Sequence, residues 1–577
     1  MPSSEEKSAT RPGWSGLPPA QSPALCPPSA RGPRRTALFA FLFLAFCVVW
    51  FGNLDYRKLV RPDEGRYAEI AREMAVSGDW VTPRLNGIKY FEKPPLQYWT
   101  TAAAFRAFGE HEWTARLWTS VTGLAGIFLT FVAASLLFGR RAGFLGALVA
   151  GSRLLYAGMG HFNTLDMGLT LFMSLALFGI ALALRDEAGG RESRAWMLAA
   201  WAAMALAVLS KGLIGVVLPA AAVVLYMLVQ RDIRPLRRLH PVAGIAIFLV
   251  IVLPWFIAVS LANPEFPRFF FIHEHFARFF TKVHHRTAPW WYFIVILLLG
   301  MLPWTFALPK MLAQAWRGAA DAGTFRPQRY LLIAAVVILV FFSASQSKLL
   351  SYILPMFPLL AALFGHYLAD VSGRTLLRQV LPVVVLAAVG LAVAPFAENF
   401  ATAKTSTALY EAFDDWLVAA ALTLLAGSVL AICLAWRERV QSAVIVLAGA
   451  GLLFVQLVLT GHEALSPSFS AARAAAVVRP YLQPEVPFYS VQTYEHTLPF
   501  YIKRTVTLVD YEGEFHFGLQ HEPQLMIPSM QEFEMRWQRD AAALAVMGPD
   551  VYRELYQRRF PMQVISEDGR RVIVRKP

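Results

Sequence analysis

Two acidic residues, an arginine and a tyrosine stand together directly after the first apolar run of the chain, in the order Asp63-Glu64-Gly65-Arg66-Tyr67. If a helix begins at Pro62, Asp63 and Arg66 lie on one face because they are three residues apart. An arginine can bind a phosphate through two parallel hydrogen bonds, and a neighbouring carboxylate can orient a substrate or accept a proton. This pattern suits an anionic lipid headgroup. The alternative is an ordinary ion pair on a solvated interfacial helix.

A second group of aromatic and charged residues follows in the same loop. It contains Tyr90, Glu92 and Lys93, and the sequence Pro94-Pro95 then favours the start of a helix. A lysine among aromatic side chains is also typical of a membrane-interface belt, where its stem lies along apolar surface. Because Arg66 stands in the same loop, we interpret this group as part of a phosphate-binding site.

Three further polar residues stand where later apolar runs begin on the same predicted side. Asp166 stands at the start of the fourth run, where a carboxylate can also serve only as a favourable charge at a helix N-terminus. Lys348 and Tyr352 belong to the stretch that opens the tenth run and again suit a phosphate.

Histidines gather in a later loop, at residues 261–289. His273 and His275 flank Glu274, and His284 is followed by His285. Such a group can contribute to a divalent-metal site, although the sequence has no HExxH spacing. The alternative is a set of ordinary surface histidines.

The composition indicates that these residues belong to a membrane protein. Of the 577 residues, 56% are hydrophobic and only 16% are charged, against about one-quarter charged in a typical soluble protein. The net charge of +14 fits cationic loops that fix membrane topology better than a nucleic-acid partner. The 3 cysteines include no CxxC pair, so they imply neither a disulfide scaffold nor a metal site.

The apolar runs predict an all-α polytopic membrane protein, because a spanning helix needs about 20 apolar residues. Ionisable residues are almost absent from the runs, so we expect a site at the membrane surface. Short arginine-rich connections alternate with longer ones, and cationic connections of a membrane protein lie in the cytoplasm. This rule places the N-terminus in the cytoplasm and the C-terminus outside. We expect about 13 spans, at 37–53, 113–137, 142–159, 165–184, 195–210, 212–229, 241–260, 290–309, 329–345, 350–369, 378–396, 415–436 and 440–461.

Three regions follow from this pattern. Residues 1–36 are rich in proline, serine and alanine and predict a disordered cytoplasmic tail, and 37–462 form the transmembrane domain with outer loops 53–112 and 261–289. In residues 463–577 strand-length apolar stretches alternate with helix-like ones, which predicts a small α/β domain outside the membrane. Within it, Ser529 and Glu532 have the spacing of a capping box.

These motifs occur in the same order in one known group of enzymes. Asp63 to Glu69, Ser77 to Trp80, Tyr90 to Pro94, Leu209 to Gly212 and Lys348 to Pro355 together resemble the polyprenyl-phosphate-sugar glycosyltransferases of the C-type fold, relatives of protein O-mannosyltransferases. Within these, the chain is most similar to the group that transfers 4-amino-4-deoxy-L-arabinose to lipid A. The similarity is strong over about residues 37–370 and architectural elsewhere.

The resemblance implies an inverting transferase in the bacterial inner membrane with its active site facing the periplasm. Its donor is a sugar on undecaprenyl phosphate and its acceptor a phosphate of lipid A, and the product binds cationic antimicrobial peptides such as polymyxin less well. We expect no organic cofactor, no nucleic-acid partner and a monomer surrounded by membrane lipids. Carried over motif by motif, the catalytic residues are Asp63 and Asp166, the donor phosphate contacts are Arg66, Tyr67, Tyr90, Lys93 and Tyr352, and the ligands of a divalent metal, zinc or magnesium, are Glu92 and His273.

Two other functions stay open. A relative that uses another polyprenyl-phosphate sugar and a protein or glycan hydroxyl needs a base to remove the hydroxyl proton, and Asp63 is the first candidate. A lipid flippase without catalysis is disfavoured, because neither matched halves nor buried charges are visible in the sequence.

Overall fold

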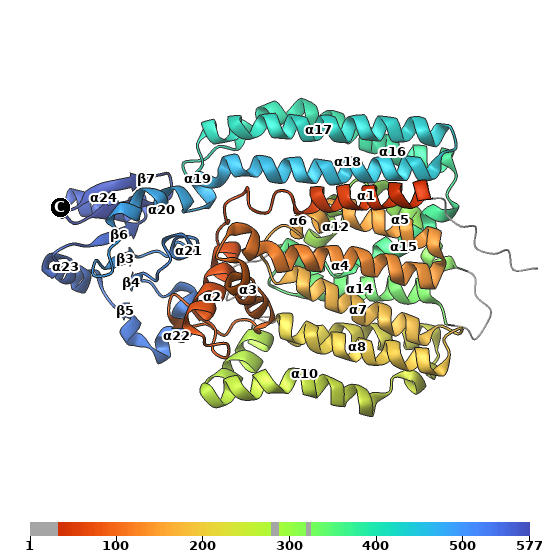
Figure 1. Cartoon of the computed structure of the whole chain (residues 1–577), viewed down its shortest axis with the longest axis horizontal. Coiled ribbons are helices and arrows are strands. Elements are labelled where there is room, and N and C mark those ends of the chain that lie inside the picture. Colours follow the sequence, from red (N-terminus) through yellow and green to blue (C-terminus); the bar gives the residue numbers. More distant parts are fainter. Residues whose placement is uncertain (1–32, 278–287, 319–324) are drawn as a thin grey trace, which may run out of the picture. The chain divides into compact units, whose positions relative to one another are not determined.

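The computed structural model describes residues 33–277, 288–318 and 325–577. Most of the predicted tail, residues 1–32, and the histidines at 284 and 285 therefore lie outside the described residues. The described part of the chain forms two units, which divide between Val48 and Val49. The helix α1 (Pro33–Phe51) begins in the first of these units. The remaining elements belong to the second (Figure 1).

Every predicted apolar run lies on helix, because backbone groups in lipid must be satisfied within the segment. Among the described residues, eight helices are long and apolar enough to cross a membrane, or nine if one bent pair counts as a span. These eight contain α4 (Glu112–Phe138), α7 (Asp166–Leu184), α8 (Gly190–Lys211), α10 (Pro241–Ala262), α14 (Pro327–Ala344), α16 (Gly373–Val393), α17 (Thr407–Trp436) and α18 (Val440–Gly461). Three shorter helices lie among them, namely α5 (Arg140–Ser152), α9 (Ile214–Gln230) and α15 (Met356–Asp370).

Two of the predicted runs are not single straight helices. The run 142–159 breaks at Arg153 into α5 and the short α6 (Leu154–Met159). The run 290–309 forms α12 (Tyr292–Gly300), which is followed after a break by α13 (Leu308–Arg317), and the two are bent by 110°. Leu302 and Pro303 lie in that break, where the proline has no N–H to continue a helix.

The expectation of no buried charge is wrong at two of the few ionisable residues that lie in the runs. Arg153 and Arg116 are both fully buried. Arg153 donates to the carbonyl of Phe357 at 2.6 Å and so joins the α5–α6 break to α15. A single arginine in an otherwise apolar run carries no sequence signal that distinguishes such a structural contact from a loop charge.

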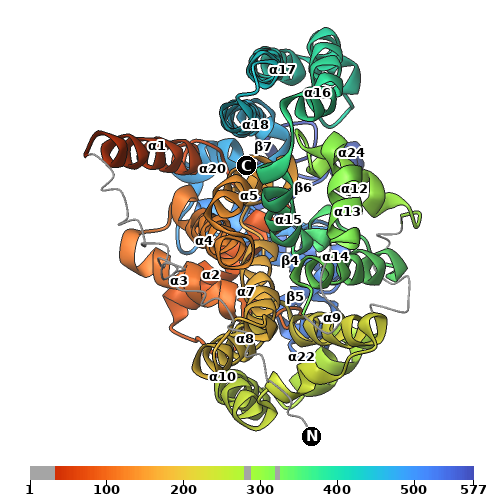
Figure 2. The same cartoon turned by 90° about the vertical axis from the view of Figure 1, so that its right-hand side faces the viewer.

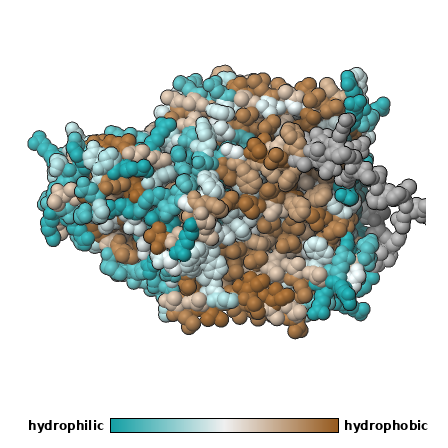
Figure 3. All heavy atoms as spheres, in the orientation of Figure 1, coloured by the Kyte–Doolittle hydropathy of each residue, from teal (hydrophilic) through white to brown (hydrophobic). Residues whose placement is uncertain are grey.

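The helices pack in an order that follows the chain only in part. α7 contacts α8 and α4, α5 contacts α15 and α4, and α17 lies between α16 and α18 (Figure 2). On the face shown in Figure 3, hydrophobic residues cover the helical part and hydrophilic ones gather at its ends and over the strand-containing part. This distribution is expected of helices that cross a membrane.

The loop between the first two runs is folded. It contains α2 (Asp63–Ser77), a hairpin of β1 (Arg84–Leu85) and β2 (Ile88–Lys89), and α3 (Leu96–Phe108). The hairpin turns through Asn86 and Gly87, whose φ angles of 55° and 76° suit the Asn-Gly sequence. α2 ends at Gly78, where φ is 77°.

The C-terminal residues form one six-stranded sheet in the order β5-β4-β3-β6-β8-β7. The first four of these strands in space are parallel, and β8 and β7 are antiparallel additions. Ser529 caps α23 (Met530–Arg539) by accepting from the backbone N–H of Glu532, which is one of the two bonds of the predicted capping box. The strands are β3 (Phe488–Val491), β4 (Thr507–Val509), β5 (Met526–Ile527), β6 (Leu544–Met547), β7 (Gln563–Glu567) and β8 (Val572–Arg575).

Both faces of this sheet are covered. One face packs with α23 and α24 (Pro549–Gln557) in a hydrophobic cluster that includes Trp537 and Leu555. The other face shares a cluster with the first loop, in which Phe488 and Leu508 lie with Tyr67 and Tyr98. Strands buried on two faces read as continuous apolar runs, which is why β3 and β6 are visible in the sequence.

Candidate active site

The start of α2 places the first predicted pair. Asp63 is the first residue of the helix, and its Oδ1 lies 2.9 Å from Arg66 Nη1, one turn further on. The Arg66 side chain is 9% exposed and that of Asp63 35%. The predicted common face is confirmed, with the carboxylate as the more accessible partner.

Arg66 has a second acidic partner that the sequence did not reveal. Its Nη2 lies 2.6 Å from Oε2 of Glu514, in the C-terminal part of the chain. The other oxygen of Glu514 is 2.7 Å from Nε2 of His496, and since a carboxylate only accepts, this nitrogen carries the proton. Burial alone would raise the pKa of Glu514, but Arg66 and His496 outweigh it and hold the pKa below its ordinary value.

Three tyrosines surround this pair. Tyr67, Tyr90 and Tyr98 are 8%, 2% and 0% exposed. Burial, reinforced by the Asp63 carboxylate, raises the pKa of Tyr67 well above its ordinary value. Burial also raises the pKa of Tyr90, although the charge of Arg66 opposes it. The phenols are therefore neutral, and each can donate one hydrogen bond.

Glu92 and Lys93 lie in the segment between β2 and α3, and both are half-buried. Lys93 Nζ donates to the Glu92 carbonyl at 2.6 Å. The Glu92 carboxylate is close enough to act on the ionisation of Tyr67 and Tyr90. The two predicted stretches of the first loop therefore meet in space.

Asp166 and Tyr352 form a second group, joined by a residue to which the sequence assigned no role. Lys211 Nζ pairs with Asp166 Oδ1 and also lies 4.5 Å from the centroid of the Tyr352 ring. Lys211 is the last residue of α8, and Gly212 follows with a φ of 91°. Asp166 is thus more than a charge at a helix N-terminus. In the sequence, the motif Leu209 to Gly212 contributed only to the family resemblance, and Lys211 within it was given no role.

Buried contacts link the two groups. Leu165, which precedes Asp166, packs in the same hydrophobic cluster as the three tyrosines. Gln97 Nε2 donates to Asn163 Oδ1 at 2.8 Å, and the Asn163 backbone N–H donates to Glu64 Oε1 at 2.9 Å. The segment before α7 is therefore attached to both α3 and α2.

Glu64 anchors α2. Its carboxylate receives two bonds from Arg116, with Nε–Oε1 2.7 Å and Nη2–Oε2 2.8 Å. The same guanidinium donates to the carbonyls of Leu54 and Arg57 at 2.7 and 2.6 Å. Burial would raise the pKa of Glu64, but Arg116 holds it below its ordinary value. The second acid of the motif is a buried structural residue, whereas the first one faces the site.

The C-terminal part forms one wall of the site. Asn86 and Val506 exchange two hydrogen bonds of 2.7 and 2.8 Å. A Cβ on Gly65 would lie 2.6 Å from the His496 carbonyl oxygen, so α2 and the segment of His496 are in close contact at this glycine. Leu59 N–H donates to the Tyr501 hydroxyl at 2.8 Å. These contacts are what allow Glu514 to reach Arg66.

The predicted metal ligands are not brought together by the described residues. No group of three or more His, Cys, Asp or Glu side chains that could hold a metal is found in the part of the chain that the structure describes. The backbone of His273 lies in a π-helical segment, Arg268–Ala277, but its side chain lies outside the described residues. The metal therefore stays a prediction.

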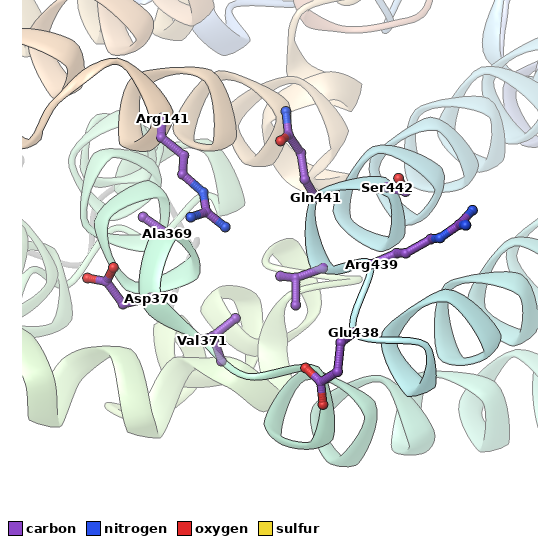
Figure 4. A pocket seen from close by; sticks show the side chains of 9 residues that line it. Arg141, Ala369, Asp370, Val371, Glu438, Arg439, Gln441 and Ser442 are labelled. Atoms are coloured by element: carbon purple, nitrogen blue, oxygen red, sulfur yellow. The ribbon is translucent and has the colours of Figure 1, made fainter.

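A polar hollow of about 470 Å³ lies elsewhere, where the connections α15–α16 and α17–α18 meet the start of α5 (Figure 4). Arg141 and Arg439 line it together with Asp370 and Glu438, and all four are exposed. The Glu438 carboxylate accepts from the backbone N–H of Gly373, at the start of α16, at 2.8 Å. Balanced exposed charges and a helix-end contact account for this hollow, and none of the predicted site residues lines it.

Comparison with known proteins first identifies the class. Residues 36–270 match the family model of dolichyl-phosphate-mannose-protein mannosyltransferase. The archaeal oligosaccharyltransferase AglB from Archaeoglobus fulgidus shares the fold, with a TM-score of 0.50 at 13% identity, over 89% of this chain and 69% of AglB. Fold and matched model together define a multi-pass membrane protein with the architecture of lipid-linked-sugar glycosyltransferases.

More similar relatives then identify the family. Residues 474–576 match the aminoarabinose transferase C-terminal domain. The crystal structure of ArnT from Cupriavidus metallidurans bound to undecaprenyl phosphate has a TM-score of 0.89 at 40% identity, over 94% of this chain and 98% of that one. An undecaprenyl phosphate-alpha-4-amino-4-deoxy-L-arabinose arabinosyl transferase from Erwinia tasmaniensis is 31% identical over 84% of this chain and 88% of its own length. The chain belongs to the family of these aminoarabinose transferases.

Coverage differs between the curated relatives. The protein of the same name from Aeromonas salmonicida is 37% identical over 328 residues. That alignment covers 57% of this chain and only 59% of the relative's length.

Proposed function

We propose that this chain transfers 4-amino-4-deoxy-L-arabinose from undecaprenyl phosphate to phosphate groups of lipid A. One observation carries the proposal: the Asp63–Arg66 pair lies near three buried tyrosines, on which Glu92 also acts. The family membership supports the same donor. The product would carry less negative charge and bind cationic antimicrobial peptides less well.

Arg66 and Lys93 would hold the phosphate of the donor. Arg66 binds Asp63 and Glu514 in this structure, so the phosphate would replace the more exposed Asp63 at Nη1, and Lys93 would add a point charge. Two apolar hollows of about 290 and 210 Å³ share Leu154 and Leu299 as lining residues. The larger one also touches Leu350, two residues before Tyr352. We assign this surface to the start of the prenyl chain, because it is apolar and leads to the second group of site residues.

The reaction exchanges one bond at the anomeric carbon. A lipid A phosphate oxygen attacks this carbon from the side opposite the donor phosphate, and the bond to the donor phosphate oxygen breaks with its electron pair. Undecaprenyl phosphate leaves with the extra negative charge, which Arg66 and Lys93 offset. The nucleophile is already anionic at neutral pH, so no base is needed. Asp63 then orients the donor amine, and Asp166 acts through Lys211.

The placement of the protein belongs to the same proposal. We assign about 13 spans, a cytoplasmic N-terminus and a periplasmic C-terminal domain, because the short connections are rich in arginine. The membrane is then the bacterial inner membrane, and the site lies at its periplasmic face. A reporter fused after residue 465 should be periplasmic, whereas one within residues 231–240 should be cytoplasmic.

A divalent metal at Glu92 and His273 is the least developed part of the proposal. When bound, zinc or magnesium would supply positive charge beside the donor phosphate. Elemental analysis of purified protein, compared between wild type and the Glu92→Gln variant, tests it. A wild type without stoichiometric metal at full activity contradicts it.

A hydroxyl acceptor is the alternative, and one observation favours it. The Asp63 carboxylate remains 35% exposed in its ion pair and is therefore accessible as a base. Purified protein is incubated with labelled undecaprenyl phosphate-aminoarabinose and lipid A, dephosphorylated lipid A or a hydroxyl-bearing peptide. Label on lipid A alone supports the proposal. Label on the peptide supports the hydroxyl acceptor. Label on no acceptor contradicts the proposal and leaves only an alternative that uses another polyprenyl-phosphate sugar.

A further inference from the structure

Two segments that each carry an arginine meet at one aromatic residue next to the candidate site. Arg61 stands just before α2, and Arg570 stands in the turn between β7 and β8. The backbone N–H of Arg61 donates to the Phe469 carbonyl at 2.9 Å. The guanidinium carbon of Arg570 lies 5.2 Å from the centroid of the Phe469 ring. Segments from both ends of the chain therefore meet at Phe469, and each of them carries an arginine.

The carboxylates nearest to Arg570 bind a neighbouring arginine instead. The adjacent Arg571 pairs with Asp568 at 2.9 Å and with Glu495 at 3.2 Å. Neither Arg61 nor Arg570 has an ion pair among the described residues, and the Nε of each is buried without a hydrogen-bond partner. Burial and the charges of Arg61 and Arg571 lower the pKa of Arg570 below its ordinary value, although Glu495 and Asp568 oppose the shift. Buried donors without acceptors are unfavourable unless a ligand or water satisfies them.

Arg61 also lies close to the donor side of the site. It is two residues before Asp63, and the charges of Arg66 and Arg61 both act on the ionisation of Tyr511. Arg66 is occupied by Asp63 and Glu514, whereas Arg61 is not. This short segment thus carries one arginine that is paired with two carboxylates and one that has no ion pair among the described residues.

The surroundings of Arg570 suit an amphiphile. A Cβ on Gly569 would lie 2.7 Å from the carbonyl oxygen of Ala403, so this turn packs on the connection before α17. Just before that connection, Phe396 and Phe400 are 59% and 68% exposed. Exposed aromatic side chains beside cationic ones are typical of a membrane surface. An anion attached to acyl chains can therefore reach the arginines from the lipid.

We propose that Arg61 and Arg570 form the binding site for the phosphate of the acceptor lipid. The inference deepens the proposed function, since it names the place where lipid A waits beside the donor. Two guanidinium groups can share the oxygens of one phosphomonoester, which relieves their mutual repulsion and satisfies the buried Nε donors. Other sources of the same chemistry are an ordinary anionic phospholipid and free phosphate.

Kinetics of the Arg570→Gln variant test this site. With lipid A varied at saturating donor, KM for lipid A should rise about tenfold or more, since a hydrogen bond to a charged group is lost. With donor varied, KM for the donor should stay within twofold. Arg570→Lys should recover part of the loss. The matched control is Arg575→Gln in β8, where the arginine donates to Gln563 at 2.8 Å.

A binding measurement separates this inference from the proposed function. Detergent-solubilised wild type and variants are titrated with lipid A, with phosphatidylglycerol and with inorganic phosphate, without donor. The inference is supported if Arg570→Gln and Arg61→Gln bind lipid A more weakly than wild type but bind the other two ligands as wild type does. This holds even if no transfer is ever observed. Equal weakening for phosphatidylglycerol, or binding of inorganic phosphate as tight as lipid A, overturns the acceptor assignment. Unchanged lipid A binding in variants of wild-type thermal stability also overturns it.

Discussion

Glu514 and Arg66, from opposite ends of the chain, meet at 2.6 Å and leave both side chains nearly buried. The carboxylate is shared with His496, so one acid holds an arginine and a histidine together. The C-terminal part, whose sequence contains no recognisable catalytic motif, thereby sets the position of the main candidate for donor phosphate binding.

Glu514→Gln should therefore lower activity without preventing folding. The amide keeps the volume and one acceptor, but the charge that fixes Arg66 is lost. We expect kcat/KM to fall by about 10- to 100-fold, as small displacements of a positioning group do. The control is Glu512→Gln, whose carboxylate is 56% exposed and pairs with His516. Equal activity of the two variants would show that Glu514 does not position Arg66.

Lys93→Ala should lose most activity and leave expression unchanged, because a half-buried lysine bonded to a neighbouring carbonyl contributes little to folding. Lys93→Arg should regain part of it if the residue acts mainly as a charge. Initial rates with purified protein measure both. Lys503→Ala, at a side chain 45% exposed, serves as the control. A fully active alanine variant would remove Lys93 from donor binding.

Asp63→Asn separates the two acceptor classes. If a lipid A phosphate attacks, no proton is removed, and the residual rate of the variant should follow the wild-type pH profile. If a hydroxyl attacks, loss of the base should cost roughly 10²–10⁴-fold, and higher pH should partly restore the rate. We expect the first result. Rescue by high pH points to the hydroxyl acceptor, and wild-type activity excludes Asp63 from the site.

Asp166 and Lys211 should behave as one unit. Asp166→Asn and Lys211→Met should each reduce kcat/KM, and the double variant should be no worse than the poorer single one, because each removes the same ion pair. Glu192→Gln on α8, which breaks the pair with Arg185, is the control and should stay active. Losses that multiply in the double variant would mean independent roles.

Glu64→Gln should mainly affect stability. Breaking a buried ion pair and leaving Arg116 uncompensated costs about 3–5 kcal/mol. Thermal unfolding in detergent measures the change, and Glu110→Gln, in the surface pair with Lys503, should cost at most about 1 kcal/mol. Similar unfolding temperatures for the two variants would contradict the anchoring role.

The Glu64 carboxylate should also make the stability of the folded protein depend on pH. Because the pKa of folded Glu64 lies below its ordinary value of 4.5, the unfolded chain binds the proton more readily. The contribution of Glu64 is therefore complete above 4.5 and is lost as the pH falls through the lower folded value. The unfolding temperature of the wild type should decline more steeply in acid than that of Glu64→Gln. Parallel curves would show that Glu64 is not held ionised.

Local patterns predicted much of this fold. The helix at Asp63, the placement of the apolar runs on helices, and β3 and β6 follow from periodicity and burial that neighbouring residues express together. The breaks at Arg153 and after Gly300 were missed, because a run of apolar residues looks the same whether the helix is straight or bent.

The residues of the candidate site also fall into those that the sequence revealed and those that it did not. Asp63, Arg66 and Tyr67 are neighbours in one helix, so spacing revealed them. Glu514 and His496 could not be found, since their link to Arg66 depends on tertiary contacts such as Gly65 against His496. Lys211 stood in a recognised motif, but only its ion pair with Asp166 shows what it does.

The bonds between Asn86 and Val506 have a consequence for synthesis of the protein. A ribosome releases the first loop long before the last strands, so a growing chain already inserted in the membrane has Asp63 and Arg66 but lacks Glu514. The site is completed only when translation ends and the final segment docks. A chain truncated by a late stop codon would keep most of its helices and still be unable to work.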